Sequence, residues 1–432
     1  MASSSSTTPA TGVVWVAIDI AKAMHQVLIE EPSGQRRVLR VANTRSGVDA
    51  LVARLTSYAV PCEVAFEPTG DYHRPLAYWL GQAGCRLHLV SSLAVARTRE
   101  ARYNSWDKND PKDAQVILHL LKTGHTQRFI DPAVTGTIDL QEVANTYHQL
   151  SLRKVRLYHT LVTHHLPLFF PEAAGYLHSS RATWGTSLLH FAPCPAVARR
   201  YSQAEFIAAA TTTVRGRKTD RVRWLADFHV AALTSIGVPV AEDSEAIRMF
   251  RLLLEEYQAA CDRRAQLEAS VTERLRDHPD FVRLQTLPGV GPVLALTILA
   301  EAGDVRRFRH VRQFLKYAGF DLATAQSGQA RGTPRLSKRG NARLRCAFWM
   351  AATIAIRMQQ NTFRRKYEAY IRPDPLSADR KRKAYTACAA KMARVAHAVL
   401  TTGIDYRRFA EVARPGGRTP SLRAVEASPT TS

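Results

Sequence analysis

Short β-branched runs and helical patterns alternate over the first 130 residues, and their order restricts the chain to few folds. Three runs, "VVWVAIDIA", "HQVLIEE" and "QRRVLRVAN", follow one another with short turns between them, which predicts three strands in meander order. After them come the helical pattern "SGVDALVARLTSY", with Ser46 as its expected N-cap, the strand "CEVAFEP", a helix from about Tyr72 to Gly81, and the strand "RLHLVSS". This order predicts a mixed sheet covered by helices.

The predicted fold class is α/β plus α. Residues 13–130 have the layout of a ribonuclease H-like domain, and residues 131–280 are predicted to be helical. Within them, residues 244–278 carry apolar side chains near heptad spacing, which fits a coiled coil and a long helix in a bundle equally well. Residues 281–405 form a third, mostly α region. The polar ends, residues 1–12 and 406–432, are predicted to be disordered tails.

Most of the basic charge lies in the third region. The formal net charge is +23, and residues 306–394 hold 22 Lys and Arg against 4 Asp and Glu. Such one-signed charge, interspersed with aromatic residues, indicates a polyanionic partner, with nucleic acid favoured over an anionic membrane surface. No segment resembles a membrane span or a signal peptide, so a cytoplasmic protein is predicted. The six cysteines are scattered, which indicates neither a zinc site nor a disulfide framework.

Four acidic residues stand in positions that need a physical reason. Asp19 lies within the apolar run "VAIDIA", and Glu67 closes the fourth predicted strand. Asp110 and Asp113 lie three residues apart at the start of the helical pattern "DPKDAQVILHLLK", so they can share one helix face. Alone, that pair is explained by the helix macrodipole. If the first and fourth strands are neighbours, however, all four carboxylates can converge, and oxygen ligands of this kind suit Mg²⁺ or Mn²⁺.

Two stretches of the third region favour contact with nucleic acid. "LQTLPGVGPVLALTILAEAG" predicts a turn at Gly289 and Gly291 and a helix from Pro292, as in a helix-hairpin-helix that binds phosphate; a plain helical hairpin is the alternative. Further on, Ser327 lies in a Gln-Ser-Gly loop and could act as a nucleophile near arginines, but the residues alone favour a turn serine that caps a helix or touches phosphate. Ser337 is the competing candidate. The basic residues expected to bind nucleic acid are Arg331, Arg335, Lys338, Arg339 and Arg343.

The motifs together resemble one family. "VAIDIAK", "FEPTG", "KNDPKDA", "LPGVGPVLA" and "QSG" followed by "LSKRGNARLR" look like the insertion-sequence-110 transposases, which are bridge-RNA-guided recombinases, over roughly residues 13–400. The resemblance implies a RuvC-like first domain and a Mg²⁺ site of the Asp-Glu-Asp-Asp type. It also implies a catalytic serine, a non-coding bridge RNA, and a homo-oligomer, dimer or tetramer, in which one subunit's serine completes another's acidic site. By this resemblance, the residues that bind the metal are Asp19, Glu67, Asp110 and Asp113, and the residue that attacks the DNA is Ser327. The usual "K-T-D-R-x-D-A" is here "KNDPKDA", which keeps both aspartates.

The predicted function is that of a bacterial DNA transposase or recombinase, an enzyme of phosphoryl transfer on DNA. Two alternatives stay open at this point. A Holliday-junction nuclease would use a metal-activated water and no serine. A non-catalytic protein that binds DNA or RNA would not need Asp19 and Glu67 in apolar strands.

Overall fold

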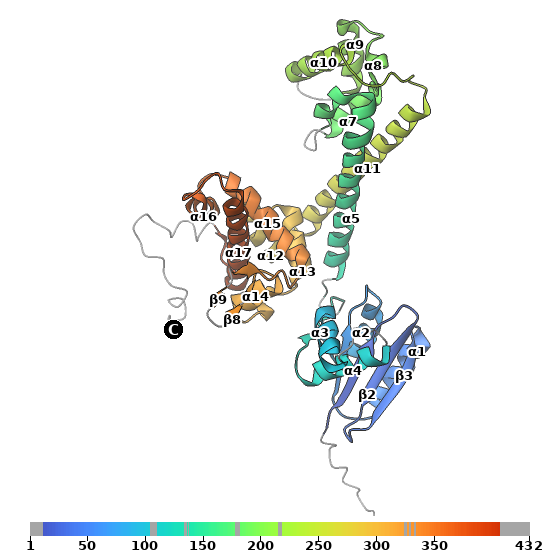
Figure 1. Ribbon diagram of the computed structural model, residues 1–432, viewed down its shortest axis with the longest axis vertical. Coiled ribbons are helices and arrows are strands. Elements are labelled where there is room, and N and C mark those ends of the chain that lie inside the picture. Colours follow the sequence, from blue (N-terminus) through green and yellow to red (C-terminus); the bar gives the residue numbers. More distant parts are fainter. Residues whose placement is uncertain are drawn as a thin grey trace, which may run out of the picture. The chain divides into compact units, whose positions relative to one another are not determined.

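The computed structural model describes residues 12–103, 110–133, 136, 138–177, 182–214, 218–323, 326–327, 330–331 and 334–406. It divides into two compact units, Met1–Ile138 and Asp139–Ser432 (Figure 1). The predicted tails lie outside the described residues, except for their innermost positions, 12 and 406. A mixed sheet in the first unit and a helical second unit confirm the coarse prediction of α/β plus α.

A six-stranded sheet forms the centre of the first unit, in the order β3-β2-β1-β4-β5-β6. Its strands are β1 Val14–Asp19, β2 Met24–Glu30, β3 Arg36–Ala42, β4 Cys62–Glu67, β5 Arg86–Leu89 and β6 Gln127–Arg128. β1, β2 and β3 pair antiparallel, as the meander predicts, whereas β4 runs parallel to both β1 and β5. The first and fourth strands are therefore neighbours, which is the arrangement on which the predicted carboxylate cluster depends.

One face of this sheet carries a large apolar cluster. Val16, Ile18, Val64 and Phe66 point into it, because side chains alternate between the two faces of a strand. They pack against α1 (Arg45–Thr56) and α2 (His73–Gln82). The N-cap of α1 is Thr44, whose side chain accepts from the Gly47 N–H, so the predicted cap at Ser46 is wrong by two residues.

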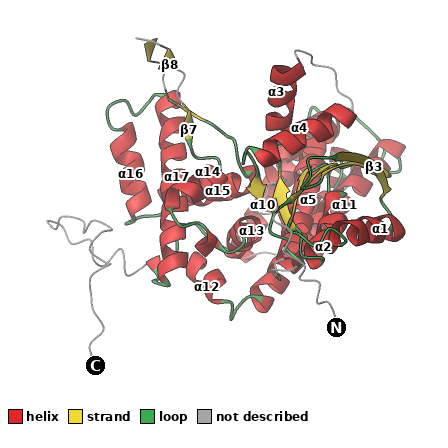
Figure 2. Ribbon diagram, turned by 90° about the horizontal axis from the view of Figure 1, so that it is seen from below, coloured by secondary structure: helices red, strands yellow, loops and turns green. Residues whose placement is uncertain are grey.

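The opposite face is covered by α4 (Asp110–Lys122), with α3 (Ser92–Tyr103) beside it. Here the strands contribute small residues, Ala17 and Ala65, which let the helix approach closely and pack against Ala114 and Ile117. Figure 2 shows the sheet between α4 on one side and the pair α1 and α2 on the other. Helix α4 thus lies directly over the strands that carry Asp19 and Glu67.

The first part of the second unit packs around its own hydrophobic cluster, which includes Phe170, Phe206, Phe228 and Phe250. It comprises α5 Ile138–Thr160, η1 Leu161–His165, α6 Leu166–Phe169, η2 Pro171–Tyr176, α7 Ala182–Phe191, α8 Pro195–Ala198, α9 Gln203–Thr213, α10 Lys218–Leu233 and α11 Glu245–Arg274. The buried residues of α11 are shared between two clusters, since Val271 packs with the next one. A coiled coil in this stretch stays a prediction.

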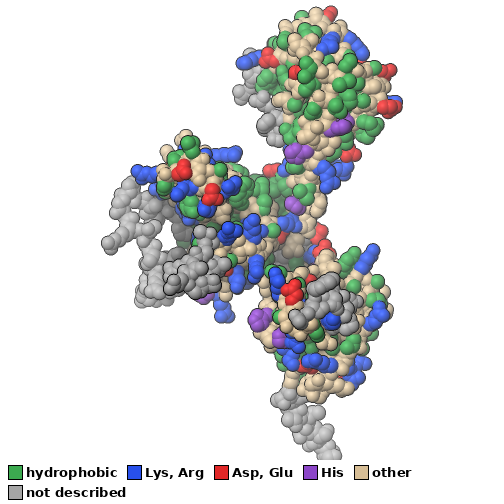
Figure 3. All heavy atoms as spheres, viewed as in Figure 1, with side chains coloured by type: hydrophobic (Ala, Val, Ile, Leu, Met, Phe, Trp, Pro, Cys, Tyr) green, Lys and Arg blue, Asp and Glu red, His purple; other side chains and the backbone are tan. Residues whose placement is uncertain are grey.

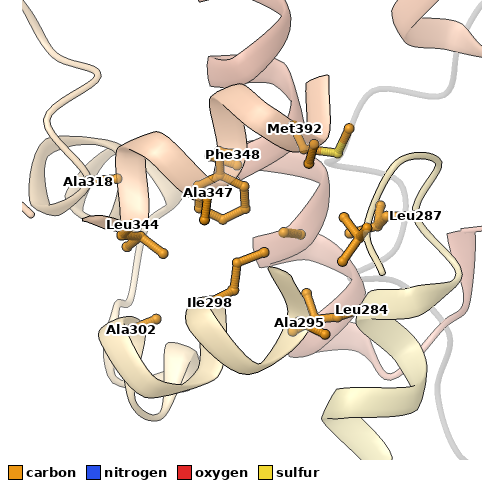
Figure 4. Close-up of a cluster of buried hydrophobic side chains, with 14 of the residues drawn as sticks. Leu284, Leu287, Ala295, Ile298, Ala302, Ala318, Leu344, Ala347, Phe348 and Met392 are labelled. Carbon is orange, nitrogen blue, oxygen red and sulfur yellow. The ribbon is translucent and has the colours of Figure 1, made fainter. Parts of the chain in front are cut away.

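The C-terminal part of the second unit packs around another cluster. Its helices are α12 Pro279–Gln285, α13 Pro292–Ala302, η4 Val305–Arg307, α14 Val311–Tyr317, α15 Ala342–Arg357, α16 Thr362–Ile371 and α17 Ala378–Thr402. Two-residue strands form two small pairs, β7 Leu322–Ala323 with β10 Arg335–Leu336, and β8 Gln326–Ser327 with β9 Ala330–Arg331. Figure 4 shows Ile298 of α13, Phe348 of α15 and Met392 of α17 gathered in the cluster.

The turn before α13 has a packing role. The helix begins at Pro292, as predicted, with Gly291 as its N-cap. Gly289 has φ +83°, and a Cβ there would lie 2.3 Å from the Ala351 carbonyl oxygen of α15. A side chain at this position would therefore push α15 away. The close approach is made by a helix of the chain itself, and a helix-hairpin-helix function stays a prediction.

Among the described helices, we find none with the length and apolar character that crossing a membrane requires.

Candidate functional site

Two acidic residues stand side by side at one end of the sheet. Asp19 is the last residue of β1 and Glu67 the last of β4, and the two are register partners in the parallel pair. Neighbouring strands lie about 4.8 Å apart, so the two backbones are adjacent. Each side chain follows its alanine, Ala17 or Ala65, by two residues and therefore points to the α4 face. Both are half-buried, and Asp19 takes part in a polar or ring interaction within the chain.

Asp113 lies on α4, one residue before the alanine that packs on this same sheet face. Its side chain is 1% exposed. One oxygen, Oδ1, accepts a hydrogen bond of 2.5 Å from Nε of Arg99 on α3, whose side chain is 11% exposed. The other oxygen, Oδ2, is buried and has no hydrogen-bond partner among the described residues. Such an atom is costly to bury, so it needs a ligand or a donor.

Asp110 is the first residue of α4, and its side chain lies outside the described part of the chain. Helical spacing alone places it one turn before Asp113. Within the residues that the structure describes, no three His, Cys, Asp or Glu side chains form a group that could hold a metal ion. The predicted set is thus brought together in part: Asp19 and Glu67 are adjacent, and Asp113 belongs to the helix above them.

The donor types present fit a hard divalent cation. Mg²⁺ and Mn²⁺ prefer carboxylate oxygens and use few protein ligands, completing their shells with water and substrate phosphate. Oδ2 of Asp113 is an oxygen that hydrogen bonding within the described residues leaves unsatisfied. By donor type, Asp19, Glu67 and Asp113 would therefore suit such an ion, although the described side chains by themselves do not assemble a three-ligand group.

A second buried acid lies on the same sheet face, near the other end of α4. Glu30 of β2 accepts from Lys122 of α4 and, at 2.9 Å, from Arg36 of β3. Burial by itself would raise the pKa of Glu30, but the hydrogen bonds from Lys122 and Arg36 outweigh it and lower that pKa. Each of the two carboxylate oxygens has a cationic partner, so Glu30 ties α4 to the sheet and offers no open ligand position.

Sequence reasoning missed both Arg99 and the Glu30 pairs. Arg99 is one of three arginines in "ARTREAR", and nothing in that pattern distinguishes it from its exposed neighbour Arg97. Glu30 ends an apolar strand, as Asp19 does, and by that signal alone it would have been an equal candidate. The structure separates the two, because cations occupy both oxygens of Glu30.

In the second unit, the predicted basic residues divide into two groups. Arg335, Lys338 and Arg339 are exposed, as nucleic-acid contact requires, and Figure 3 shows many Lys and Arg side chains on the surface of this unit. Arg343 instead pairs with Glu301 at 2.9 Å and donates to Asn145, so it serves the packing of α13, α15 and α5. The side chain of Arg331 lies outside the described part of the chain.

The two candidate serines differ in what can be stated of them. Ser327 closes β8 and pairs in register with Ala330, and its side chain is outside the described residues. Ser337 is half-buried in a turn, where its N–H donates to the Asp321 carbonyl at 2.8 Å and its hydroxyl accepts from the Arg339 N–H at 3.4 Å. The next residue, Lys338, has φ +55°, an uncommon conformation for a residue with a side chain.

Two protein-family models match the chain. Residues 16–171 match a DEDD-type IS110 model described as "Transposase", and residues 282–368 match "Transposase IS116/IS110/IS902 family". The "Mini-circle putative transposase for IS117" of Streptomyces coelicolor is 28% identical over 381 residues, which cover 82% of this chain and 88% of the relative. The "Transposase for insertion sequence element IS1111A" of Coxiella burnetii is 29% identical over 162 residues, or 37% of this chain and 42% of that one.

Among solved structures, a part of the chain matches the one titled "T. thermophilus RuvC in complex with Holliday junction substrate", with 16% identity and a TM-score of 0.19. The match covers 27% of this chain and 99% of that one. At this score the likeness carries no argument about function.

Proposed function

We propose that this chain, which belongs to the IS116/IS110/IS902 family of transposases, rearranges DNA by phosphoryl transfer with a divalent cation held at the end of its sheet. Family membership supports the cutting and rejoining of DNA in general. The cation, its ligands and the nucleophile are our proposals. The proposed ligands are Asp19, Glu67, Asp110 and Asp113, with Mg²⁺ or Mn²⁺ as the ion.

One observation carries the metal proposal. Asp19 and Glu67 are register partners on the sheet face that α4 covers, and the α4 residue Asp113 has a buried oxygen that no described donor satisfies. Carboxylates placed together repel one another and cost stability unless a cation compensates them. When bound there, a divalent ion would neutralise charge on the phosphate oxygens during strand transfer. The strand order 3-2-1-4-5 also supports a ribonuclease H-like, RuvC-type first domain.

For the nucleophile we propose Ser327. Its Oγ would attack a DNA phosphorus and form a phosphoserine ester, while the deoxyribose oxygen leaves and takes up a proton in place of the one that the serine loses. A hydroxyl of another DNA strand would then attack the ester, which frees the serine and rejoins the backbone. The support is the "QSG" motif within a region rich in exposed Lys and Arg, which stabilise phosphate charge.

We further propose, on the family resemblance, a non-coding RNA that pairs with the DNA, and a homo-oligomer in which one subunit's serine serves another's carboxylates. A protein guided in this way reads backbone and shape, for which one-signed charge is suited. Exposed basic residues such as Lys338, Arg339 and Arg382 support a nucleic-acid surface in the second unit.

The family does not favour the two alternatives, and one assay separates them. The full chain is incubated with DNA bearing the element's end, denatured with detergent, and examined for DNA covalently attached to protein. The serine route predicts an adduct that Ser327→Ala abolishes and Ser337→Ala keeps. Metal-dependent cleavage without an adduct would favour the nuclease that activates water, and binding without cleavage would leave a non-catalytic protein.

A further inference from the structure

We propose that Arg99 is a positioning residue of the carboxylate site: it holds one oxygen of Asp113 and turns the other toward the cation. This inference rests on the metal site proposed above. Arg99 acts through the orientation of Asp113 and itself contacts neither the cation nor the DNA.

The geometry of the pair is specific. A single hydrogen bond of 2.5 Å joins Arg99 Nε to Asp113 Oδ1, and both side chains are buried or nearly so. A buried charged side chain that makes a short hydrogen bond to a partner of opposite charge has few orientations open to it. Because Arg99 fixes Oδ1, the position of Oδ2 is fixed as well.

Glu30 shows what a purely structural pair looks like on the same sheet face. There, Lys122 and Arg36 pair with different oxygens of Glu30, so neither oxygen is left to bind a metal ion. At Asp113, one oxygen is paired and the other is buried without a described partner. In a pair that only joins α3 to α4, both buried oxygens of the carboxylate are expected to be hydrogen-bonded. The half-paired state is that of a metal ligand held by an outer hydrogen bond.

A second link between α3 and α4 supplies a matched control. The Tyr103 hydroxyl donates to Oε1 of Gln115 at 2.8 Å and involves no carboxylate of the site. Tyr103→Phe loosens the contact between the two helices without altering Asp113. A change in metal binding that follows Arg99 but not Tyr103 therefore belongs to the orientation of the carboxylate.

The experiment titrates the full chain with Mn²⁺ and follows binding by electron paramagnetic resonance and calorimetry, with the melting temperature in EDTA as a separate readout of folding. The variants are Arg99→Gln, Arg99→Lys, Tyr103→Phe and Asp19→Asn. Loss of an outer hydrogen bond weakens metal binding by about 10- to 100-fold, which is the result expected for Arg99→Gln. For Arg99→Lys we expect about 3- to 10-fold, since an ammonium on a flexible stem orients its acceptor less well. Tyr103→Phe keeps the parental affinity.

Parental or tighter Mn²⁺ binding in folded Arg99→Gln overturns the inference. If Arg99→Gln does not fold, Arg99→Lys replaces it in the test. Parental Mn²⁺ affinity in Arg99→Lys would show that the guanidinium is not required, and it would overturn the inference. Asp19→Asn tests the metal proposal separately. If Asp19→Asn loses Mn²⁺ binding while the Arg99 variants bind Mn²⁺ like the parent chain, the metal site stands and only the positioning role of Arg99 is rejected. A parent chain that binds no Mn²⁺ rejects both.

Discussion

The two ends of α4 hold buried carboxylates in opposite states. Near its C-terminal end, Lys122 and Arg36 satisfy both oxygens of Glu30. Near its N-terminal end, Arg99 satisfies only one oxygen of Asp113, and this is the end at which β1 and β4 present Asp19 and Glu67. Burial of an acid is therefore no sign of a site by itself. The informative feature is an acid whose pairing within the protein is incomplete.

The largest expected effect is a difference in DNA strand-transfer activity between variants at the two ends of α4. Asp113→Asn is expected to lower DNA strand transfer by about 10³-fold, because a cation that stabilises transition-state charge is worth several kcal/mol. Glu30→Gln should keep the rate within about threefold, since Lys122 and Arg36 already occupy its two carboxylate oxygens. Both are measured as recombined product from element-end DNA. Equal losses in the two variants would erase the distinction between the ends.

The next effect concerns stability at the Glu30 end. Glu30→Gln should lower the unfolding free energy by about 1.5–3 kcal/mol near neutral pH, because it weakens hydrogen bonds between charged groups. The pKa of Glu30 is lowered in the folded protein, so the carboxylate contributes stability above the pKa of an unfolded glutamate, about 4.3, and this is lost as pH falls through the folded value. Urea melts at pH 7 and at pH 3 test this. A parent–variant difference that does not shrink with falling pH would contradict the pairing.

A smaller effect is expected at the link between α3 and α4. Tyr103→Phe removes one hydrogen bond to Gln115 and should cost about 0.5–1.5 kcal/mol, with DNA rearrangement kept. Chemical denaturation and the strand-transfer assay are run on the same preparation. A loss of activity comparable to that of Asp113→Asn would show that loosening α3 suffices to disable the site.

The smallest expected effect is a change in stability at an exposed ion pair within α3. Arg97 pairs with Glu100 at 2.9 Å on the exposed side of this helix. Arg97→Gln should change the unfolding free energy by at most about 0.5 kcal/mol, since solvent screens such pairs. The same denaturation curves measure it. A penalty above about 1 kcal/mol would contradict the expectation that solvent screens this exposed pair.

The sequence predicts the sheet well because its signals are local. β-branched runs, short turns and the alternation of faces predict the strands themselves and the antiparallel meander of β1 to β3. That β1 and β4 are neighbours, which places Asp19 beside Glu67, was only a condition of the prediction, taken from the ribonuclease H-like layout, and the structure meets it. The helix start at Pro292 follows from a local rule as well. The wrong N-cap shows the limit of such rules, because Thr44 and Ser46 are both good caps and only the path of the chain selects Thr44.

The sequence does not show which charged side chains pair with one another across different helices. Arg99 and Asp113 are 14 residues apart on different helices, and Arg343 meets Glu301 from another helix. Charged residues offer many such pairings, and the packing of the helices decides among them. Gly289 gives a backbone example: a Cβ there would lie 2.3 Å from the Ala351 carbonyl oxygen of α15, a packing constraint that the local motif does not reveal, and its contact with phosphate stays a prediction.

If the carboxylates of β1, β4 and α4 hold one divalent cation, a mapping of the sites at which a bound metal cuts the backbone tests this most directly. Fe²⁺ is added to the full chain in place of Mg²⁺, with ascorbate and peroxide, and the hydroxyl radicals formed at the bound iron cleave nearby backbone. Mass spectrometry of the fragments should find cuts clustered close to Asp19, Glu67 and Asp113, and Asp19→Asn should remove them. Cuts that lie elsewhere in the chain, or that persist in Asp19→Asn, would contradict the account.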